Sequence, residues 1–186
     1  FRQATLERVS LELERQYVAQ GRYGASIDTI IEELPRNRVS IKIEIEEGKS
    51  SGIRHINLVG AKAFDRDMLL GQIELQHPSL LSFYKNDDKY SREKLSGDLE
   101  TLESYYKDRG YAEFRIQSTQ VSVTPDKRQV YITIGIDEGS VYEVNDVTLV
   151  GDLGDVGAEP IEALIIVKPG QIFSQALITA SEERIT

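Results

Sequence analysis

The sequence repeats one pattern of turn, strand and glycine at a distance of 91 residues. Residues 35–48 and 125–139 each contain a polar turn, an alternation of apolar and polar residues, and an acidic residue followed by Glu and Gly. Their final glycines, Gly48 and Gly139, are 91 positions apart. Self-similarity at a fixed period is the sequence signature of tandem structural units. The chain is therefore predicted to come from an array of similar modules.

Other segments repeat with nearly the same offset. They are a helical pattern that ends in Gly, the strand after each repeated glycine, and the residue pair that opens a long helix: Tyr17–Gly21 with Tyr106–Gly110, Ile56–Gly60 with Val147–Gly151, and Tyr90–Ser91 with Phe173–Ser174. The repeats predict three parts. Residues 1–48 are the last helix and two strands of one module, 49–139 are a complete module, and 140–186 are the first strand and two helices of a third. Both ends of the chain are expected to be boundaries within a longer protein.

Two helices are predicted in the complete module. Asp65 is expected to cap a short helix over 66–75, which Pro78 ends, because its side-chain oxygen can accept from first-turn amides. Ser91 is expected to cap a longer helix, and Gly110 to end it, since glycine adopts left-handed backbone geometry at low cost. The apolar residues of this helix form one stripe: Leu95, Leu99, Leu102 and Tyr106.

Three strands complete the module. They are predicted over 53–59, 112–124 and 130–137, and a polar turn joins the last two. The fold class is α+β, with tandem β-α-α-β-β modules in which two antiparallel helices cover one face of a three-stranded mixed sheet. The apolar positions of the last strand are expected to face the helices: Val130, Ile132, Ile134 and Ile136.

The strand over 112–124 has an irregular alternation. Phe114 and Ile116 share one parity, whereas Val121 and Val123 have the opposite one. One inserted residue produces such a change, so a β-bulge is predicted near Thr119-Gln120. The alternative is a regular strand with apolar residues on both faces.

Composition argues against several functions. The 186 residues carry a formal net charge of -9, which disfavours binding to nucleic acid. The chain contains no cysteine, which excludes a thiol nucleophile and cysteine-ligated zinc. His55 and His77 lack metal-ligand spacing, so no metal site and no cofactor are expected. KH-type RNA-binding modules share the β-α-α-β-β order, but no G-x-x-G joins the two helices here.

Several segments resemble POTRA domains, the polypeptide-transport-associated modules of outer-membrane assembly factors in Gram-negative bacteria. The resemblance extends over essentially the whole chain, and these segments carry it: Leu34–Val39, Lys94–Leu102, Ser104–Tyr106, Asp108–Ala112 and Ser118–Lys127. It implies that the chain spans the end of a second module, all of a third and the start of a fourth.

The resemblance also implies a function and a location. POTRA modules lie in the periplasm, attached to a membrane β-barrel that this chain lacks, and they bind unfolded outer-membrane proteins and accessory lipoproteins. No enzyme activity and no cofactor are implied. Membrane contact is expected only through the absent barrel.

In POTRA modules the second strand of the order lies at the edge of the sheet. An edge strand has unpaired backbone groups that can bind an extended chain. The residues expected to form this partner-binding edge are Arg115, Gln117, Ser118, Thr119, Gln120, Val121 and Val123. The alternative is an edge that has no partner.

The connection between the two helices is a second candidate surface. It is eight residues longer than its counterpart before Phe173, because the repeat offset falls from 91 to 83 across it. Its apolar residues are Leu80, Leu81, Phe83 and Tyr84. Apolar residues on a long loop can mark a contact surface. Alternatively, they fold back onto the core of their own module.

Two other functions remain open from the sequence. The modules can act as a rigid spacer that holds a barrel away from soluble partners. They can also belong to another secretion or translocation system that uses POTRA repeats, because the barrel that would distinguish these systems is absent.

Overall fold

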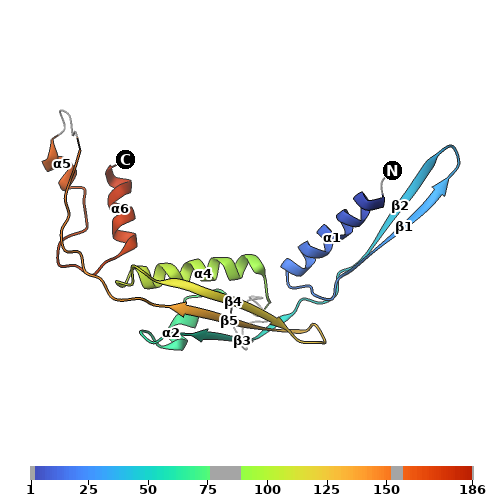
Figure 1. The fold of residues 1–186 in the computed structure, drawn as a ribbon, viewed down its shortest axis with the longest axis horizontal. Coiled ribbons are helices and arrows are strands. Elements are labelled where there is room, and N and C mark those ends of the chain that lie inside the picture. Colours follow the sequence, from blue (N-terminus) through green and yellow to red (C-terminus); the bar gives the residue numbers. More distant parts are fainter. Residues whose placement is uncertain (1–2, 76–88, 152–156, 186) are drawn as a thin grey trace. The chain divides into compact units, whose positions relative to one another are not determined.

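The computed structural model describes residues 3–75, 89–151 and 157–185 (Figure 1). The chain divides into two compact units, each described by itself. Unit 1 comprises Phe1–Asn57, Glu74–Gly97 and Gln120–Thr133, and unit 2 comprises Leu58–Ile73, Asp98–Thr119 and Ile134–Thr186.

The complete module has the predicted β-α-α-β-β order. The helices are α1 (Gln3–Ala19), α2 (Arg66–Leu70), α4 (Arg92–Lys107), α5 (Ala158–Glu162) and α6 (Gln175–Ile185). The strands are β1 (Ser26–Leu34), β2 (Arg38–Glu46), β3 (Gly52–Val59), β4 (Arg115–Val123) and β5 (Gln129–Asp137). The complete module is formed by β3, α2, α4, β4 and β5.

Strands β3, β5 and β4 form a three-stranded sheet in that order, with β5 in the centre. The amide of Gly52, at the start of β3, donates a 2.8 Å hydrogen bond to the carbonyl of Arg128, just before β5. Gly60, after the end of β3, lies against the carbonyl of Ile136 near the end of β5. These strands therefore run parallel, whereas a hairpin makes β4 and β5 antiparallel. The predicted mixed sheet and α+β class are confirmed.

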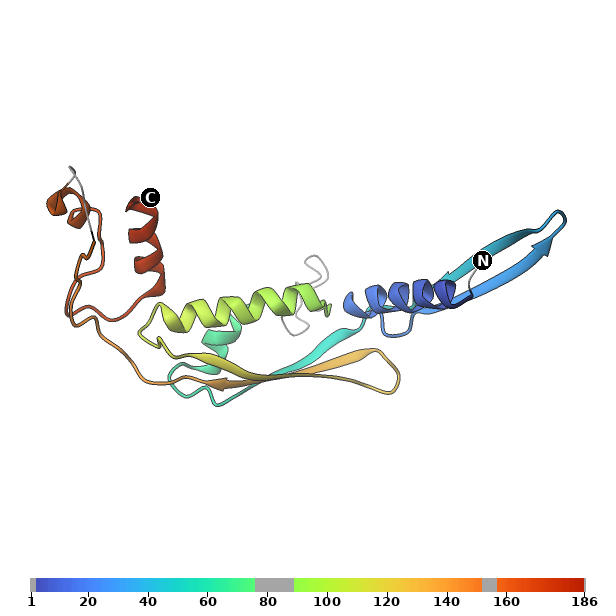
Figure 2. The ribbon, with the colours of Figure 1, turned by 45° about the horizontal axis from the view of Figure 1, so that its top comes forward.

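The core of the complete module lies between α4 and the sheet, which run alongside each other in Figure 2. The alternating residues of β5 are buried as predicted: Val130 and Ile134 are 0% exposed, Ile132 is 1% and Ile136 is 5%. From α4, Leu102 and Tyr106 are fully buried, and the Tyr106 ring stacks on Phe114 with 4.3 Å between ring centroids. Burial of these side chains is the main stabilising contribution.

Both predicted helix caps are present. The Asp65 side chain accepts a 2.9 Å hydrogen bond from the amide of Asp67, and the Ser91 hydroxyl accepts from the amide of Lys94 at 3.4 Å. The first helix is shorter than the predicted 66–75, because α2 ends at Leu70 and Gly71 closes it with a bond to the carbonyl of Asp67. The predicted stop, Pro78, lies outside the described residues.

Strands β1 and β2 form a separate two-stranded antiparallel sheet, with Ile30 opposite Lys42 and Leu34 opposite Arg38. They are the repeat counterparts of β4 and β5. Among the described residues, β2 has one neighbouring strand where β5 has two. As a result, Ile43 is 38% exposed, whereas its counterpart Ile134 is fully buried.

The strand predicted over Val147–Gly151 is not formed in the described residues of 140–186. Only an isolated antiparallel bridge between Glu143 and Ile172 is present there. In the complete module, the equivalent strand β3 pairs with β5. The described part of 140–186 contains no counterpart of β5, so the backbone of 147–151 has no strand to pair with.

Candidate partner-binding edge

The predicted edge residues do lie on an edge strand. β4 is the outer strand of the sheet, next to the central β5. Its side chains are largely exposed: Arg115, Gln117, Ser118, Thr119 and Gln120 are exposed, and Val121 and Val123 are half-buried. The position of β4 therefore agrees with the expectation from the resemblance. Partner binding at this strand stays a prediction.

The hairpin register shows which backbone groups of β4 face outward. The amide of Thr124 donates a 3.0 Å hydrogen bond to the carbonyl of Gln129, so it points toward β5. In an antiparallel pair, inward-pointing and outward-pointing groups alternate along each strand. Gln120 and Ser122 therefore bond to β5, and the backbone groups of Thr119, Val121 and Val123 point to the free edge.

The alternation of β4 changes phase at Gln117–Ser118. Gln117 donates to the Asp137 carboxylate at 3.3 Å, so it lies on the same sheet face as Asp137. The neighbouring Ser118 also lies on this face, because a Cβ on Gly135 would be 2.5 Å from its hydroxyl. Two successive side chains on one face are the mark of a bulge.

The bulge lies at Gln117–Ser118, two residues before its predicted place near Thr119-Gln120. Ser118 lies opposite Gly135, and Thr124 lies opposite Gln129. Six residues separate the two positions on each strand, so neither strand has an inserted residue between them. The parity of the apolar residues indicates an inserted residue only somewhere between Ile116 and Val121, and it cannot select the position. Regular pairing to β5 therefore covers Ser118–Val123.

The start of β4 is held by an ionic contact on the exposed face of the sheet. Arg115 donates two hydrogen bonds to Oδ2 of Asp137, from Nε at 3.0 Å and from a terminal nitrogen at 2.6 Å. These bonds lower the pKa of Asp137 below its usual range. Arg115 and Gln117 are thus occupied within the sheet, which leaves the part of β4 after the bulge as the open edge.

The other end of β4 is also fixed by side-chain contacts. The Thr124 hydroxyl donates to the Asp126 carboxylate at 2.5 Å, and the amide of Arg128 donates to the same oxygen at 3.2 Å. The hydrogen bond from Thr124 is the main cause of a lowered pKa of Asp126. Lys127 adopts a left-handed φ of 56° in this turn. The hairpin register, and with it the outward face of β4, is therefore set at both ends.

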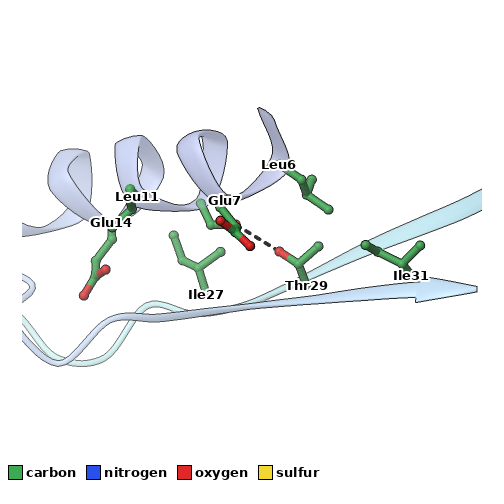
Figure 3. Close-up of a pocket in the computed structure, with 8 residues that line it drawn as sticks. Leu6, Glu7, Leu11, Glu14, Ile27, Thr29 and Ile31 are labelled. Carbon is green, nitrogen blue, oxygen red and sulfur yellow. Dashed lines mark hydrogen bonds between the residues drawn. The ribbon is translucent and has the colours of Figure 1, made fainter. Parts of the chain in front are cut away.

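A groove between α1 and β1 was not predicted from the sequence. It has a volume of about 570 Å³ and is lined by Leu6, Glu7, Ser10, Leu11, Glu14, Ile27, Thr29 and Ile31. Figure 3 shows α1 and β1 side chains converging on this groove, with a 2.9 Å hydrogen bond between Ser10 and Thr29. β1 is the counterpart of β4, so the groove lies beside an edge-type strand. The sequence signal that could have indicated this groove is the repeat that makes the β1–β2 hairpin the counterpart of the β4–β5 hairpin.

The second predicted surface, the connection between the two helices, lies outside the described residues, with its apolar residues Leu80, Leu81, Phe83 and Tyr84. Within the described ranges 3–75, 89–151 and 157–185, no group of three or more His, Cys, Asp or Glu side chains could hold a metal ion. In the same ranges, no helix is long and apolar enough to span a bilayer.

Comparison with known proteins points to one family. Residues 52–139 match the POTRA family model, described as a surface antigen variable number repeat. The outer membrane protein assembly factor BamA of Neisseria meningitidis serogroup B is 30% identical over 180 residues, which are 97% of this chain and 23% of that protein. BamA of Buchnera aphidicola is 33% identical over 150 residues, 81% of this chain and 24% of that protein. The chain thus spans about a quarter of the length of these relatives.

A solved structure supports the fold. The crystal structure of POTRA domains 3–5 of Haemophilus influenzae BamA matches with a TM-score of 0.59 and 17% identity, covering 100% of this chain and 70% of that one. At that identity, the match concerns the fold alone. Together with the matches in sequence, it shows that this chain belongs to the POTRA family and that its modules are of the kind found in BamA.

Proposed function

We propose that this chain is part of the periplasmic portion of an outer-membrane protein assembly factor. We further propose that β4 binds extended segments of unfolded outer-membrane proteins, and of accessory assembly lipoproteins, by adding them as a strand. The names of the relatives support the first statement, since both are outer membrane protein assembly factors. The proposal assigns no catalytic role to the chain.

One observation carries the binding proposal: β4 is an exposed edge whose outward backbone groups belong to Thr119, Val121 and Val123. Main-chain pairing gives affinity with little dependence on the partner's sequence. This suits a protein that receives many different unfolded chains. Transmembrane β-strands alternate apolar and polar side chains, so their unfolded segments fit a sheet edge in an extended form.

The half-buried valines add a contact for side chains. Val121 and Val123 share the helix-facing side of the sheet with Val130 and Ile132, which are buried. A strand added beside β4 would place every second side chain next to these valines. An alternating segment is therefore favoured over a uniformly polar one. The groove beside β1 offers the same combination of edge strand and apolar lining, with Leu6, Ile27 and Ile31.

The test uses a synthetic peptide of about ten residues with the alternation of a transmembrane β-strand. Val121→Pro removes one outward amide without removing a bond to β5, and edge positions of this type tolerate proline. We expect the affinity for the peptide, measured by calorimetry, to fall at least tenfold while the fold is kept. Val121→Thr is the matched control, because it changes the side chain and keeps the amide.

Ser122→Pro checks the assignment of inward and outward groups. It removes a hydrogen bond to β5, so it should lower the thermal stability where Val121→Pro does not. If the peptide bound Val121→Pro as tightly as the wild-type chain, binding at the outward edge of β4 would be excluded. If Val121→Thr weakened binding as much as proline, side-chain contacts and not backbone pairing would be responsible.

A further inference from the structure

The linker before the complete module is held by a pair of backbone hydrogen bonds. The amide of Ser51 donates to the carbonyl of Gly21, at the end of α1, with a length of 2.9 Å. The amide of Tyr90, just before α4, donates to the carbonyl of Ser51 at 3.1 Å. One linker residue therefore joins the end of one long helix to the start of the next. All three residues lie in unit 1.

The linker after the complete module has the same pair of bonds. The amide of Tyr142 donates to the carbonyl of Gly110, after α4, at 2.9 Å. The amide of Phe173, just before α6, donates to the carbonyl of Tyr142 at 2.9 Å. These residues all lie in unit 2. We call this arrangement of helix-end glycine, linker residue and helix-start residue the linker clasp.

The recurrence extends one residue further in each linker. Gly52 forms an isolated antiparallel bridge with Lys89, and Glu143 forms one with Ile172. These partners differ by 91 and 83 positions, the same offsets that relate the flanking repeats in sequence. The clasp is therefore a repeated part of the module, and the different lengths of the connections between the helices do not disturb it.

Both clasps require glycine at the helix end. Gly21 has a φ of 76°, and a Cβ there would lie 2.4 Å from the carbonyl oxygen of Tyr90. Gly110 has a φ of 100°, and a Cβ there would lie 2.7 Å from Val141 Cγ1 and 2.9 Å from Ile172 Cγ2. Left-handed backbone geometry is costly for other residues. At each helix-end glycine, a side chain would therefore collide with residues that the clasp brings close to the helix end.

Each clasp also has a side-chain contact of its own. At the first linker, the hydroxyl of the fully buried Ser51 donates a 2.6 Å bond to the carbonyl of Lys127. At the second, the Asp108 carboxylate accepts from the amide of Ala176 at 2.8 Å and from the Ser174 hydroxyl at 3.4 Å. The residue equivalent to Asp108 in the first module is Ala19. The shared element is therefore the backbone pair, and the side-chain supports differ.

We propose that the linker clasp makes each linker an ordered part of both modules that it joins. The end of one long helix, the linker residue and the start of the next long helix then move together on the nanosecond timescale. A flexible tether would leave the linker amides bonded to water. The proposal is independent of client binding, because none of the clasp residues belongs to β4.

The first test is nitrogen-15 relaxation of the unmodified 186-residue chain. Backbone order parameters are about 0.85 in rigid segments and below about 0.6 in flexible ones. We expect Ser51, Tyr90, Tyr142 and Phe173 to match the residues of β5. Values in the flexible range at both Ser51 and Tyr142 would overturn the proposal, whatever the variants show.

The second test compares two glycine substitutions by amide hydrogen exchange. Gly110→Ala should raise the exchange rates of the Tyr142 and Phe173 amides at least tenfold. Gly97→Ala is the matched control, since a Cβ at this position in α4 meets nothing within 4 Å. Ser51 serves as an internal control in the same sample, because its clasp uses Gly21. Unchanged exchange of Tyr142 in a folded Gly110→Ala chain would contradict the proposal.

Asp108→Ala provides a variant that leaves the backbone pair in place. It should raise the exchange rate of the Ala176 amide several-fold and leave the Tyr142 amide nearly unchanged. If both amides lost protection together, the side-chain contact and not the backbone clasp would hold this linker.

Discussion

The hydroxyl of Tyr106 donates a 2.9 Å hydrogen bond to Oε1 of Glu138. The same oxygen accepts from the amides of Lys62 and Ala63 at 2.8 and 2.9 Å. One carboxylate therefore joins α4, the end of β5 and the loop after β3. In the first module, the Tyr17 hydroxyl donates to Glu47 at 3.4 Å. The repeated Glu-Gly at the strand ends thus has a structural role in both modules.

Tyr106→Phe should destabilise the complete module by about 1.5 kcal/mol, the usual contribution of a hydrogen bond to a charged group. Tyr106 is fully buried. Burial is the largest cause of the raised pKa of its hydroxyl, and the hydrogen bond to Glu138 is the second. Tyr17→Phe is the matched control and should have a smaller effect, because that bond is longer and more exposed. Urea denaturation measures both, and equal effects would argue against the role assigned to Glu138.

Equivalent isoleucines in the two hairpins should differ in importance. Ile134 is 0% exposed and Ile43 is 38% exposed, although they occupy the same position in the repeat. Ile134→Ala should cost about 3 kcal/mol, in the range for a fully buried aliphatic side chain. Ile43→Ala should cost well under half of that. The measurement is the free energy of unfolding of each variant. A larger loss for Ile43→Ala than for Ile134→Ala would contradict the burial described for β2.

Gly60→Ala and Gly97→Ala should shift stability in opposite directions. Gly60 has a φ of 95°, and a Cβ there would lie 2.1 Å from the carbonyl oxygen of Ile136. Strain and displacement of the strand should cost at least about 2 kcal/mol. Gly97 lies within α4, where alanine is favoured over glycine by about 1 kcal/mol. Melting temperatures of the two variants provide the check, and a stabilised Gly60→Ala chain would refute the geometry.

The contact between Arg115 and Asp137 should stabilise the fold in a pH-dependent way. The pKa of Asp137 is lowered in the folded state, chiefly by the hydrogen bonds from Arg115. The contribution is therefore complete above the ordinary Asp pKa of about 3.9 and is lost as pH falls through the lower folded value. The measurement is the stability difference between the wild type and Arg115→Gln at pH 7 and near pH 3. A difference that grows on acidification would show the opposite linkage.

The sequence predicted the features that follow from local periodicity. The buried set from Val130 to Ile136, the cap at Asp65 and the left-handed Gly110 each follow from a residue type at a fixed spacing. The edge position of β4 came from the resemblance, because strand order depends on tertiary packing. Both placed the candidate site on a strand that lies at the edge of the sheet.

Other features depend on contacts that the sequence does not display. The end of α2 at Leu70 was missed, because Gly71 stops the helix before the expected proline. The bulge was predicted two residues too late in the chain, because its position is set by the pairing of Ser118 with Gly135, which the sequence does not show. The strand expected over Val147–Gly151 was wrong, because a strand forms only where a neighbouring strand accepts its hydrogen bonds.

The central claim is that the outward backbone groups of β4 pair with an extended partner. Amide hydrogen exchange of the chain, with and without the alternating peptide, tests it most directly. Without peptide, the amides of Gln120 and Ser122 should be protected and those of Thr119, Val121 and Val123 should exchange quickly. The account predicts that saturating peptide slows exchange at these three residues at least tenfold. Bound peptide that leaves all three amides unprotected would contradict it.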